Sequence, residues 1–201
     1  MTHRAPPFHG AVLAGGRSRR MGTDKAFVEI DGMALVVRCA TALGQAGAQS
    51  VEIIGGDRAR LEVLGFDVVD DRFPGAGPLG GLITALERHR LASAVVVLPC
   101  DLHHPSAAAI TTVLSALGSS LDGGPAPAVA VPHVAGRAQW LHAAWRPAAA
   151  LPVLLAAYEA GERALHRAAG ALPATVVTSV DPRDVDDLDT PADLPQQPTA
   201  P

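Results

Sequence analysis

Short apolar runs alternate along the chain with segments in which apolar residues recur at helical spacing. The short runs are bounded by glycine or polar residues, which is typical of strands. They lie at residues 10–14, 50–54, 66–69, 94–98, 128–131, 140–145 and 175–180. Helical spacing predicts helices at residues 33–46, 82–90, 105–117, 148–160 and 162–169. Residues 73–81 are rich in glycine and proline and predict an irregular segment.

This alternation predicts an α/β protein. Strands that alternate with helices favour right-handed crossovers and a mostly parallel sheet with helices on both faces. We therefore expect a three-layer α/β/α, Rossmann-like open sheet. At 201 residues the chain has room for one domain, which we place at residues 10–194, between a flexible start at 1–9 and a flexible tail at 195–201.

Composition narrows the class of protein. Hydrophobic residues make up 48% of the chain and aromatic residues 3%, so Ala, Val and Leu must build the core, as suits doubly buried strands. No apolar stretch reaches membrane-spanning length and the start lacks the plan of a signal peptide, so we expect a cytoplasmic protein without membrane contact. The net charge of −4 argues against a nucleic-acid binder. Cys39 and Cys100 lie in apolar segments and lack the close spacing of a zinc site.

The segment from Leu13 to Lys25 carries the strongest chemical signal, Leu-Ala-Gly-Gly-Arg-Ser-Arg-Arg-Met-Gly-Thr-Asp-Lys. Glycines after a strand let the backbone approach a ligand, and arginines supply forked donors that match phosphate oxygens. The loop therefore predicts an anion site at the carboxyl end of the first strand. Because Gly15 and Gly16 are adjacent, the Rossmann pattern G-x-G-x-x-G is excluded. The Walker pattern is excluded too, because Gly22 is not followed directly by Lys-Ser/Thr.

Lys25 is the single lysine of the chain, against fifteen arginines. A compact ammonium beside an arginine cluster suits a phosphoryl group whose charge changes during a reaction. The alternative interpretation is a surface lysine that happens to lie beside the loop.

The Leu13–Lys25 segment resembles the signature L-A-G-G-x-x-x-R-M-G-x-D-K of the nucleotidyltransferase family typified by molybdenum cofactor guanylyltransferase. The resemblance covers nearly the whole chain and implies an open sheet of the nucleotide-diphospho-sugar transferase type. It implies that Arg20 and Lys25 hold the triphosphate and act in catalysis. The nucleotide site predicted along this loop comprises Leu13, Ala14, Gly15, Gly16, Arg17 and Lys25.

Asp101 follows the apolar run at 94–98, so it ends a central strand at the edge that carries the glycine loop. We expect it to bind the nucleotide, to act in catalysis and to hold Mg²⁺, the predicted cofactor. Mg²⁺ takes one or two carboxylates and completes its octahedron with phosphate oxygens and water. Pro99-Cys100-Asp101 resembles the family's C-D-x-P segment, but here the proline comes later, after His103 and His104. These adjacent histidines lack a third ligand, so helix capping explains them better than a metal site.

Two further segments resemble the family. The passage from Asp71 to Gly80 is similar to its E-D…G-P-L-x-G segment, which implies that both residues contact the nucleoside. An aspartate in a glycine-rich turn is the alternative interpretation. The segment that contains Asp187 and Asp189 is similar to N-x-N-T-P-E-D-L, with aspartates in place of both asparagines. Our hypothesis is that these two carboxylates add to the Mg²⁺ site, although Thr190-Pro191 also reads as a helix N-cap.

Residues Arg137, His142 and Arg163 are the candidates for binding the acceptor. Strand alternation would place His142 on one face with Trp140 and Ala144. A strand with one half-buried histidine is an equally good interpretation. Arg163 lies in a Gly-Glu-Arg step that resembles one in the same family.

The resemblance implies transfer of GMP from GTP to molybdopterin, with release of pyrophosphate. The open alternatives are a cytidylyltransferase, a nucleotidyltransferase with a different phosphorylated acceptor, and a nucleotide-binding adaptor without catalysis. A molybdoenzyme or a delivery chaperone is a possible partner, and a monomer is the favoured state. No nucleophile with an adjacent base stands out, so we expect no covalent intermediate.

Overall fold

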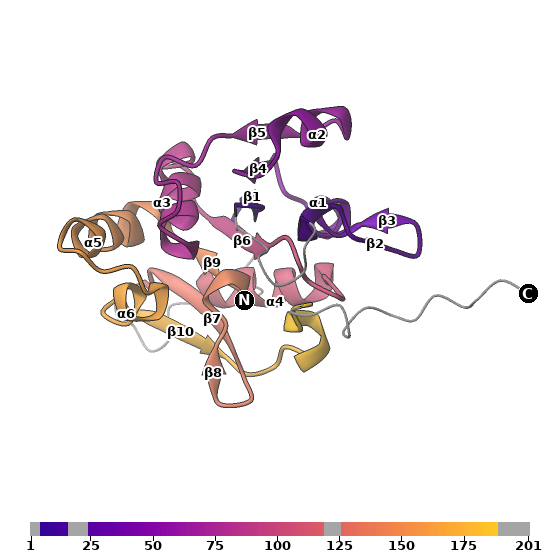
Figure 1. Cartoon of the computed structure of the whole chain (residues 1–201). Coiled ribbons are helices and arrows are strands. Elements are labelled where there is room, and N and C mark those ends of the chain that lie inside the picture. The colour runs from indigo at the N-terminus through magenta and orange to yellow at the C-terminus, as the bar shows by residue number, and fades with distance from the viewer. Residues whose placement is uncertain (1–4, 16–23, 119–125, 189–201) are drawn as a thin grey trace, which may run out of the picture.

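A central sheet organises the part of the chain that the structure, a computed structural model, describes: residues 5–15, 24–118 and 126–188. The strands of the sheet path are β1 (His9–Leu13), β4 (Val51–Ile54), β5 (Asp67–Val69), β6 (Val95–Pro99), β7 (Val129–Val134), β9 (Ala144–Trp145) and β10 (Ala174–Val177). Across the sheet they follow the order β10-β7-β9-β6-β1-β4-β5 (Figure 1).

Most neighbouring strands of this sheet are parallel. Strand β1 pairs in parallel with both β4 and β6, β5 with β4, and β10 with β7. Strand β9 is antiparallel to its neighbours β6 and β7, and the two-residue β8 (Arg137–Ala138) extends β7 as an antiparallel partner. The prediction of a mostly parallel open sheet is therefore confirmed, with β9 as its antiparallel insertion.

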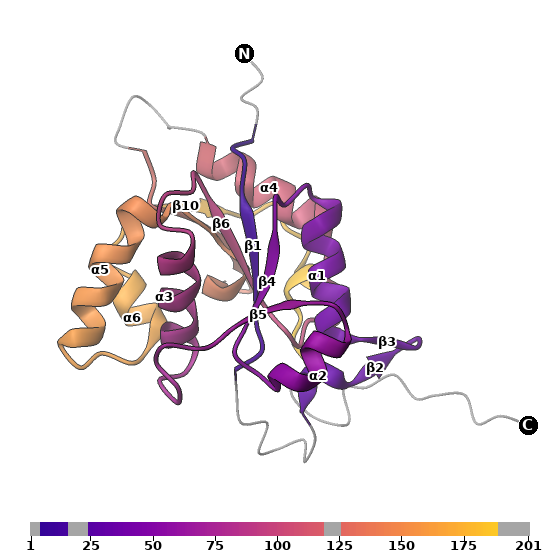
Figure 2. The same ribbon diagram turned by 90° about the horizontal axis from the view of Figure 1, so that it is seen from above.

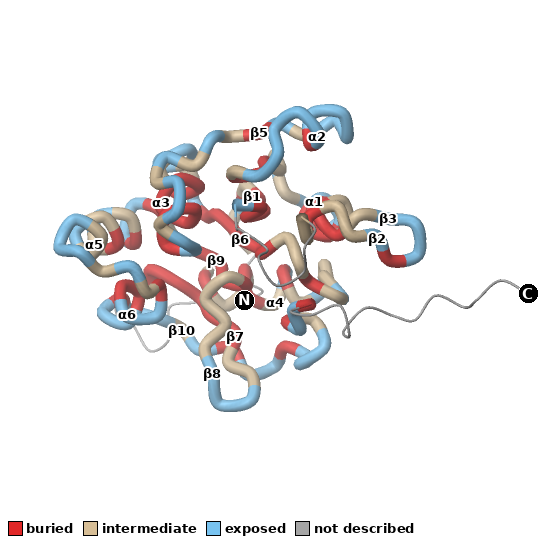
Figure 3. Tube along the Cα trace, in the orientation of Figure 1, coloured by how far each residue is buried: buried red, intermediate tan, exposed pale blue. Residues whose placement is uncertain are grey.

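Helices cover both faces of the sheet, as Figure 2 shows. They are α1 (Leu35–Gln45), α2 (Arg58–Val63), α3 (Pro78–Arg88), α4 (Ala107–Gly118), α5 (Pro147–Glu159) and α6 (Leu165–Ala169). Helices α1, α2 and α4 lie on one face, and α3, α5 and α6 on the other. Alternate side chains of β1 divide between the two cores: Val12 packs with the first group of helices, and Ala11 and Leu13 with the second. Buried residues accordingly follow the strands and the inner sides of the helices (Figure 3).

Some predicted elements differ from the structure. Residues 140–145 were expected to form one strand, but a 3-10 helix, η3 (Trp140–His142), precedes the short β9. The apolar residues of this segment mimic a strand pattern, whereas only Ala144 and Trp145 reach pairing distance of β6 and β7. Residues 73–81 were expected to be irregular throughout, but α3 begins at Pro78, a position where proline loses no helix hydrogen bond.

Several short elements had no strong sequence signal. Helix α2 has six residues and a single buried one, Leu61, which is too little periodicity to predict a helix. The 3-10 helix η1 (Lys25–Phe27) leads into a small antiparallel pair, β2 (Glu29–Ile30) and β3 (Met33–Ala34). A last 3-10 turn, η4 (Pro182–Val185), follows β10. Among the described helices, none combines the length and apolarity needed to cross a membrane.

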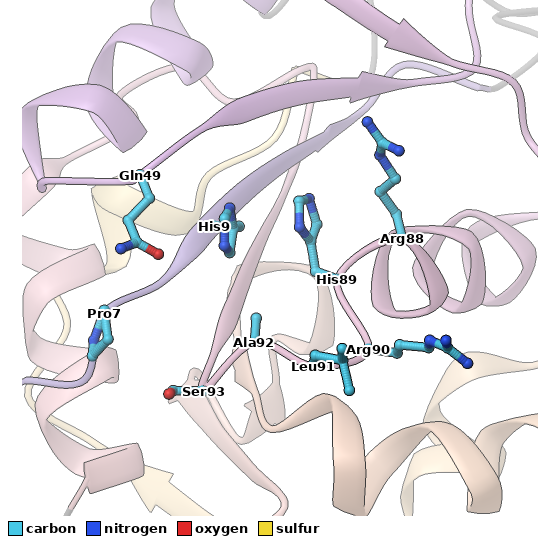
Figure 4. Close-up of a pocket in the computed structure, with 9 residues that line it drawn as sticks. All are labelled: Pro7, His9, Gln49, Arg88, His89, Arg90, Leu91, Ala92 and Ser93. Carbon is cyan, nitrogen blue, oxygen red and sulfur yellow. The ribbon is translucent and has the colours of Figure 1, made fainter.

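The amino-terminal edge of the sheet carries a pocket lined in part by His9, Arg88 and His89 (Figure 4). The rings of His9 and His89 stack with centroids 4.2 Å apart. Behind them, the buried carboxylate of Glu52 lies 2.9 Å from His89 Nε2 and accepts a hydrogen bond of 3.2 Å from Arg88 Nε. These two partners explain how β4 tolerates a buried acid.

Candidate functional site

The carboxyl ends of four parallel strands meet at one edge of the sheet. Strand β1 leads into Gly15, β4 into Gly55, β5 into Asp71 and β6 into Asp101. Backbone hydrogen bonds continue beyond the strands and hold these ends together. Ala14 N donates to Ile54 O at 3.0 Å, Gly55 N to Val69 O at 2.8 Å and Cys100 N to Leu13 O at 3.1 Å. The ends of these four strands therefore lie side by side.

Lys25 and Asp101 form an ion pair at this edge. The Lys25 ammonium lies 2.8 Å from Asp101 Oδ2, and the two side chains are 14% and 20% exposed. The Asp24 carboxylate caps η1 by accepting from Ala26 N at 3.1 Å, which fixes the backbone from which Lys25 extends. The pair joins a cation and a carboxylate, and the sequence predicts that both act on the same anionic ligand.

The segment before the C-terminus docks beside Asp101. Leu102 and Asp187 form an isolated antiparallel bridge, and Leu188 N donates to the carbonyl of Asp101 at 2.9 Å. A further backbone hydrogen bond joins the same two segments, from His103 N to Asp186 O at 3.0 Å. This segment therefore brings the backbone of Asp187 beside Leu102, the residue that follows Asp101.

The carboxylates provide the chemistry for a magnesium site. Within the described residues, no three His, Cys, Asp or Glu side chains are grouped to hold a metal ion on their own. Mg²⁺ does not need such a cage, because phosphate oxygens and water supply most of its ligands. The oxygen donors of Asp101 and Asp187 fit this ion, whereas the sulfur and nitrogen donors nearby do not.

His142 lies next to Asp187 in the protein interior. The residue is 6% exposed, and burial lowers the pKa of its imidazole to about 4. Its Nε2 is 3.7 Å from Asp187 Oδ1, which is too long for a hydrogen bond. The expected strand face shared with Trp140 and Ala144 is wrong, because His142 ends the 3-10 helix η3.

The glycine loop packs on a second glycine pair. A Cβ on Gly55 would lie 3.2 Å from the Cα of Gly15, and one on Gly56 would lie 3.0 Å from the Cβ of Ala14. Both Gly55 and Gly56 have positive φ, at 71° and 84°. By contrast, a Cβ on Gly15 would meet no described atom closer than 3.8 Å. Packing therefore demands glycine at positions 55 and 56, whereas a Cβ on Gly15 would make only ordinary van der Waals contacts with the described atoms.

Asp71 faces the same loop. Its Oδ1 accepts hydrogen bonds from Phe73 N at 2.9 Å and from Thr84 Oγ1 at 3.2 Å. Its Oδ2 is the described atom nearest to a Cβ built on Gly15. Gly80 is buried in α3, where a Cβ would lie 2.9 Å from that of Phe73. Close packing accounts for this glycine, and its contact with a nucleoside stays a prediction.

The two thiols lie behind the site rather than in it. Cys39 in α1 is buried and donates to the carbonyl of Pro99 at 3.3 Å. Burial raises the pKa of the Cys39 thiol to about 12 and raises that of Cys100 as well. Neither thiol is therefore a thiolate at neutral pH, as a nucleophile or metal ligand would have to be.

The remaining predicted residues are not brought into contact with the Lys25–Asp101 pair. Arg137 is exposed in β8. Arg163 donates to the carbonyl of Tyr158 at 2.8 Å, and its guanidinium lies 3.9 Å from the centre of the Tyr158 ring. The predicted residues Gly16, Arg17, Arg20 and Asp189 lie outside the described residues.

Sequence reasoning missed three contributors to this edge. Thr84 holds Asp71, and the pair Gly55-Gly56 supports the glycine loop from behind. The repeated pattern of an apolar strand followed by two glycines, after both β1 and β4, was the available signal. Nothing in the sequence pointed to Thr84, because it lies within α3 and is well separated along the chain from Asp71, the residue it holds.

Comparison with known proteins agrees with this geometry. A model of the MobA-like NTP transferase domain matches residues 10–176. A probable molybdenum cofactor guanylyltransferase of Opitutus terrae is 42% identical over 104 residues, which are 51% of this chain and 52% of that protein. The chain thus spans about half the length of this relative. A probable molybdenum cofactor guanylyltransferase of Chloroflexus aggregans is 34% identical over 171 residues, which are 81% of this chain and 76% of that protein.

Among solved structures, molybdopterin-guanine dinucleotide biosynthesis protein A from Archaeoglobus fulgidus has a TM-score of 0.69 at 21% identity. The match covers 92% of this chain and 93% of that one, and it shows a shared fold. The family model covers most of the chain, including β1 and the strand ends that form the Lys25–Asp101 edge. The chain belongs to the family of the MobA-like NTP transferase domain.

Proposed function

We propose that this protein transfers GMP from GTP to molybdopterin and releases pyrophosphate. The observation that carries the proposal is the Lys25–Asp101 pair, a cation and a carboxylate held 2.8 Å apart at the edge of the sheet where the glycine loop begins. Family membership and the names of the relatives support guanylyl transfer in particular.

The nucleotide binds along the carboxyl edge of the sheet. The backbone of Leu13, Ala14 and Gly15 approaches the phosphates, because glycine has no side chain to keep the main chain away from a ligand. Phe73 N and the Thr84 hydroxyl both contact Oδ1 of Asp71, and we propose that its second oxygen accepts from a ribose hydroxyl or a base. The further nucleotide contacts that we propose are Gly16, Arg17, Arg20 and Gly80.

Asp101 would hold Mg²⁺, and Asp187 and Asp189 are candidates to add to its ligands. When bound, Mg²⁺ supplies positive charge that neutralises the phosphate oxygens near the reacting phosphorus. Lys25 must then exchange its Asp101 contact for one with the nucleotide. We infer that this exchange turns the ammonium toward the phosphates only when the nucleotide is present.

The reaction is a single in-line displacement. The terminal phosphate oxygen of the pterin forms a bond to the α-phosphorus of GTP, and the bond from that phosphorus to the bridging oxygen of pyrophosphate breaks. Lys25 and Arg20 stabilise the negative charge that develops on the leaving pyrophosphate. The raised thiol pKa values of Cys39 and Cys100 agree with a route that has no covalent enzyme intermediate.

Arg137 and Arg163 are the proposed contacts for the acceptor. Both are arginines at the surface, and a forked guanidinium matches a phosphate. His142 was predicted with them, but its imidazole is buried beside Asp187, so an acceptor would have to displace covering residues to touch it. We propose a cytoplasmic monomer that delivers its product to a molybdoenzyme or a chaperone.

The test is pyrophosphate release from the purified protein with Mg²⁺ and molybdopterin, with GTP, CTP, ATP and UTP offered in parallel. We expect release with GTP. Release with CTP alone would instead identify a cytidylyltransferase. Nucleotide binding without release would favour another acceptor or an adaptor without catalysis.

The role of Asp187 has its own test. We expect Asp187→Ala to raise the Mg²⁺ concentration needed for half-maximal pyrophosphate release. Asp181→Ala is a control for the loss of an aspartate from the same part of the chain, because the Asp181 side chain caps η4 and pairs with Arg183. An unchanged requirement in Asp187→Ala would remove Asp187 from the metal site.

A further inference from the structure

His142 is a buried polar side chain without a hydrogen bond among the described residues. Neither Nδ1 nor Nε2 has a partner there, and the side chain is 5% exposed. The cavity that it lines is mainly apolar, with Leu98, Leu102 and Pro132 among its walls. Burying an imidazole without partners costs free energy, so a group kept this way calls for an explanation.

The Asp187 carboxylate lies close to this ring, and Asp184 lines the same cavity. Nε2 and Oδ1 are 3.7 Å apart, less than 1 Å beyond the usual length of such a hydrogen bond. The backbone of Asp187 is fixed through its bridge to Leu102, whereas its side chain is 41% exposed. A hydrogen bond between the two groups therefore requires Nε2 and Oδ1 to come less than 1 Å closer.

We propose that His142 is a positioning residue, which donates from Nε2 to Asp187 and so fixes the orientation of that carboxylate toward the bound metal–nucleotide complex. The inference rests on the proposed function, since Asp187 is there a candidate ligand of Mg²⁺. The His142 ring belongs to η3, the Asp187 carboxylate to the segment after η4, and Asp101 follows the end of β6. A donor from a neighbouring side chain restricts the orientation of a carboxylate that binds a metal.

A purely structural role is the alternative. In that case His142 only fills space among apolar side chains, and an apolar residue of similar volume would serve as well or better. The two roles differ in what they predict for the metal, because only positioning acts through Asp187.

The experiment measures Mn²⁺ binding, as a spectroscopic substitute for Mg²⁺, to the protein–GTP complex by electron paramagnetic resonance without acceptor. We compare the wild type with His142→Met, which removes the donor, and His142→Gln, whose amide can place a donor near the position of Nε2. His142→Met is expected to weaken Mn²⁺ binding about tenfold, and His142→Gln to restore most of the loss. Equal binding in His142→Met and the wild type would overturn the inference while leaving the proposed function intact.

A double-mutant cycle tests whether His142 acts through Asp187. In an Asp187→Ala background, His142→Met should weaken Mn²⁺ binding no further, because the residue through which it acts is gone. An equal loss in both backgrounds would show that His142 does not act through Asp187. If the wild-type complex with GTP binds no Mn²⁺, the proposed metal site and this inference both fail. Asp187 is partly exposed, so Asp187→Ala is expected to fold, and urea unfolding of each variant verifies this.

Discussion

The ammonium of Lys25 lies 2.8 Å from the carboxylate of Asp101, although the two residues are 76 positions apart in the chain. One comes from a 3-10 turn after the glycine loop and the other from the end of β6. In this pair each group compensates the charge of the other. A nucleotide with its metal offers both groups a new partner of the right sign, which makes the pair suited to an exchange on binding.

Lys25→Ala should reduce pyrophosphate release by about two orders of magnitude or more, because it removes charge stabilisation of the leaving group. The free energy of unfolding should fall by only about 1–2 kcal/mol, since the pair lies at a partly exposed edge. Steady-state turnover and urea unfolding measure the two effects. Lys25→Arg is the matched control for charge, and turnover near normal in Lys25→Ala would contradict the leaving-group role.

Asp101→Asn should weaken metal-dependent turnover and leave GTP binding without metal largely unchanged. The fold should persist, because the Leu188 N–H bonds to the Asp101 backbone carbonyl and not to its side chain. Turnover as a function of Mg²⁺ concentration and GTP affinity in a chelator test this. Loss of cooperative unfolding in the variant would instead assign Asp101 a structural role.

Elements with strong periodicity were predictable from the sequence. The strand ends at Leu13, Val69 and Pro99 follow continuous apolar runs, and parallel strands place such ends at one edge. This rule alone predicts that the backbone of Gly15, Asp71 and Asp101 lies at this edge, and no contact between them has to be known.

Contacts between distant segments were not predictable in the same way. The approach of Asp187 to His142 depends on how the last segment bridges Leu102, and nothing local in the sequence encodes that pairing. The apolar run at 140–145 predicted one strand, but only its last two residues pair with neighbouring strands. Tertiary context therefore overrode the local pattern. Helix α2 was missed because one buried leucine gives no periodicity.

Gly15→Ala and Gly56→Ala form a matched pair with opposite outcomes. At Gly15 the nearest described atom to a new Cβ is 3.8 Å away, so unfolding should change little while GTP affinity falls about tenfold or more. At Gly56 a Cβ would lie 3.0 Å from that of Ala14 in a backbone with φ of 84°, so stability should fall by roughly 1–3 kcal/mol. Urea unfolding and GTP titration distinguish them, and a similar loss of stability in both variants would refute the assignment of Gly15.

The Cys39 thiol should make stability fall in alkali. Burial raises its pKa to about 12 in the folded protein, against an ordinary value of 9.0, so the unfolded chain releases this proton at lower pH than the folded one. Its contribution is therefore fully present below pH 9 and is lost as the pH rises toward 12.

The size of the effect is set by how far the pH exceeds the ordinary thiol pKa, which gives about 1–2 kcal/mol between pH 9 and 10.5. Urea unfolding of the wild type and of Cys39→Ala over this range measures it. Cys39→Ala should be less stable near neutral pH, because it leaves a small cavity beneath Pro99, but its stability should decline less steeply in alkali. Two curves that decline in parallel would mean that the folded state does not keep this thiol protonated, and the buried position of Cys39 behind Asp101 would then be wrong.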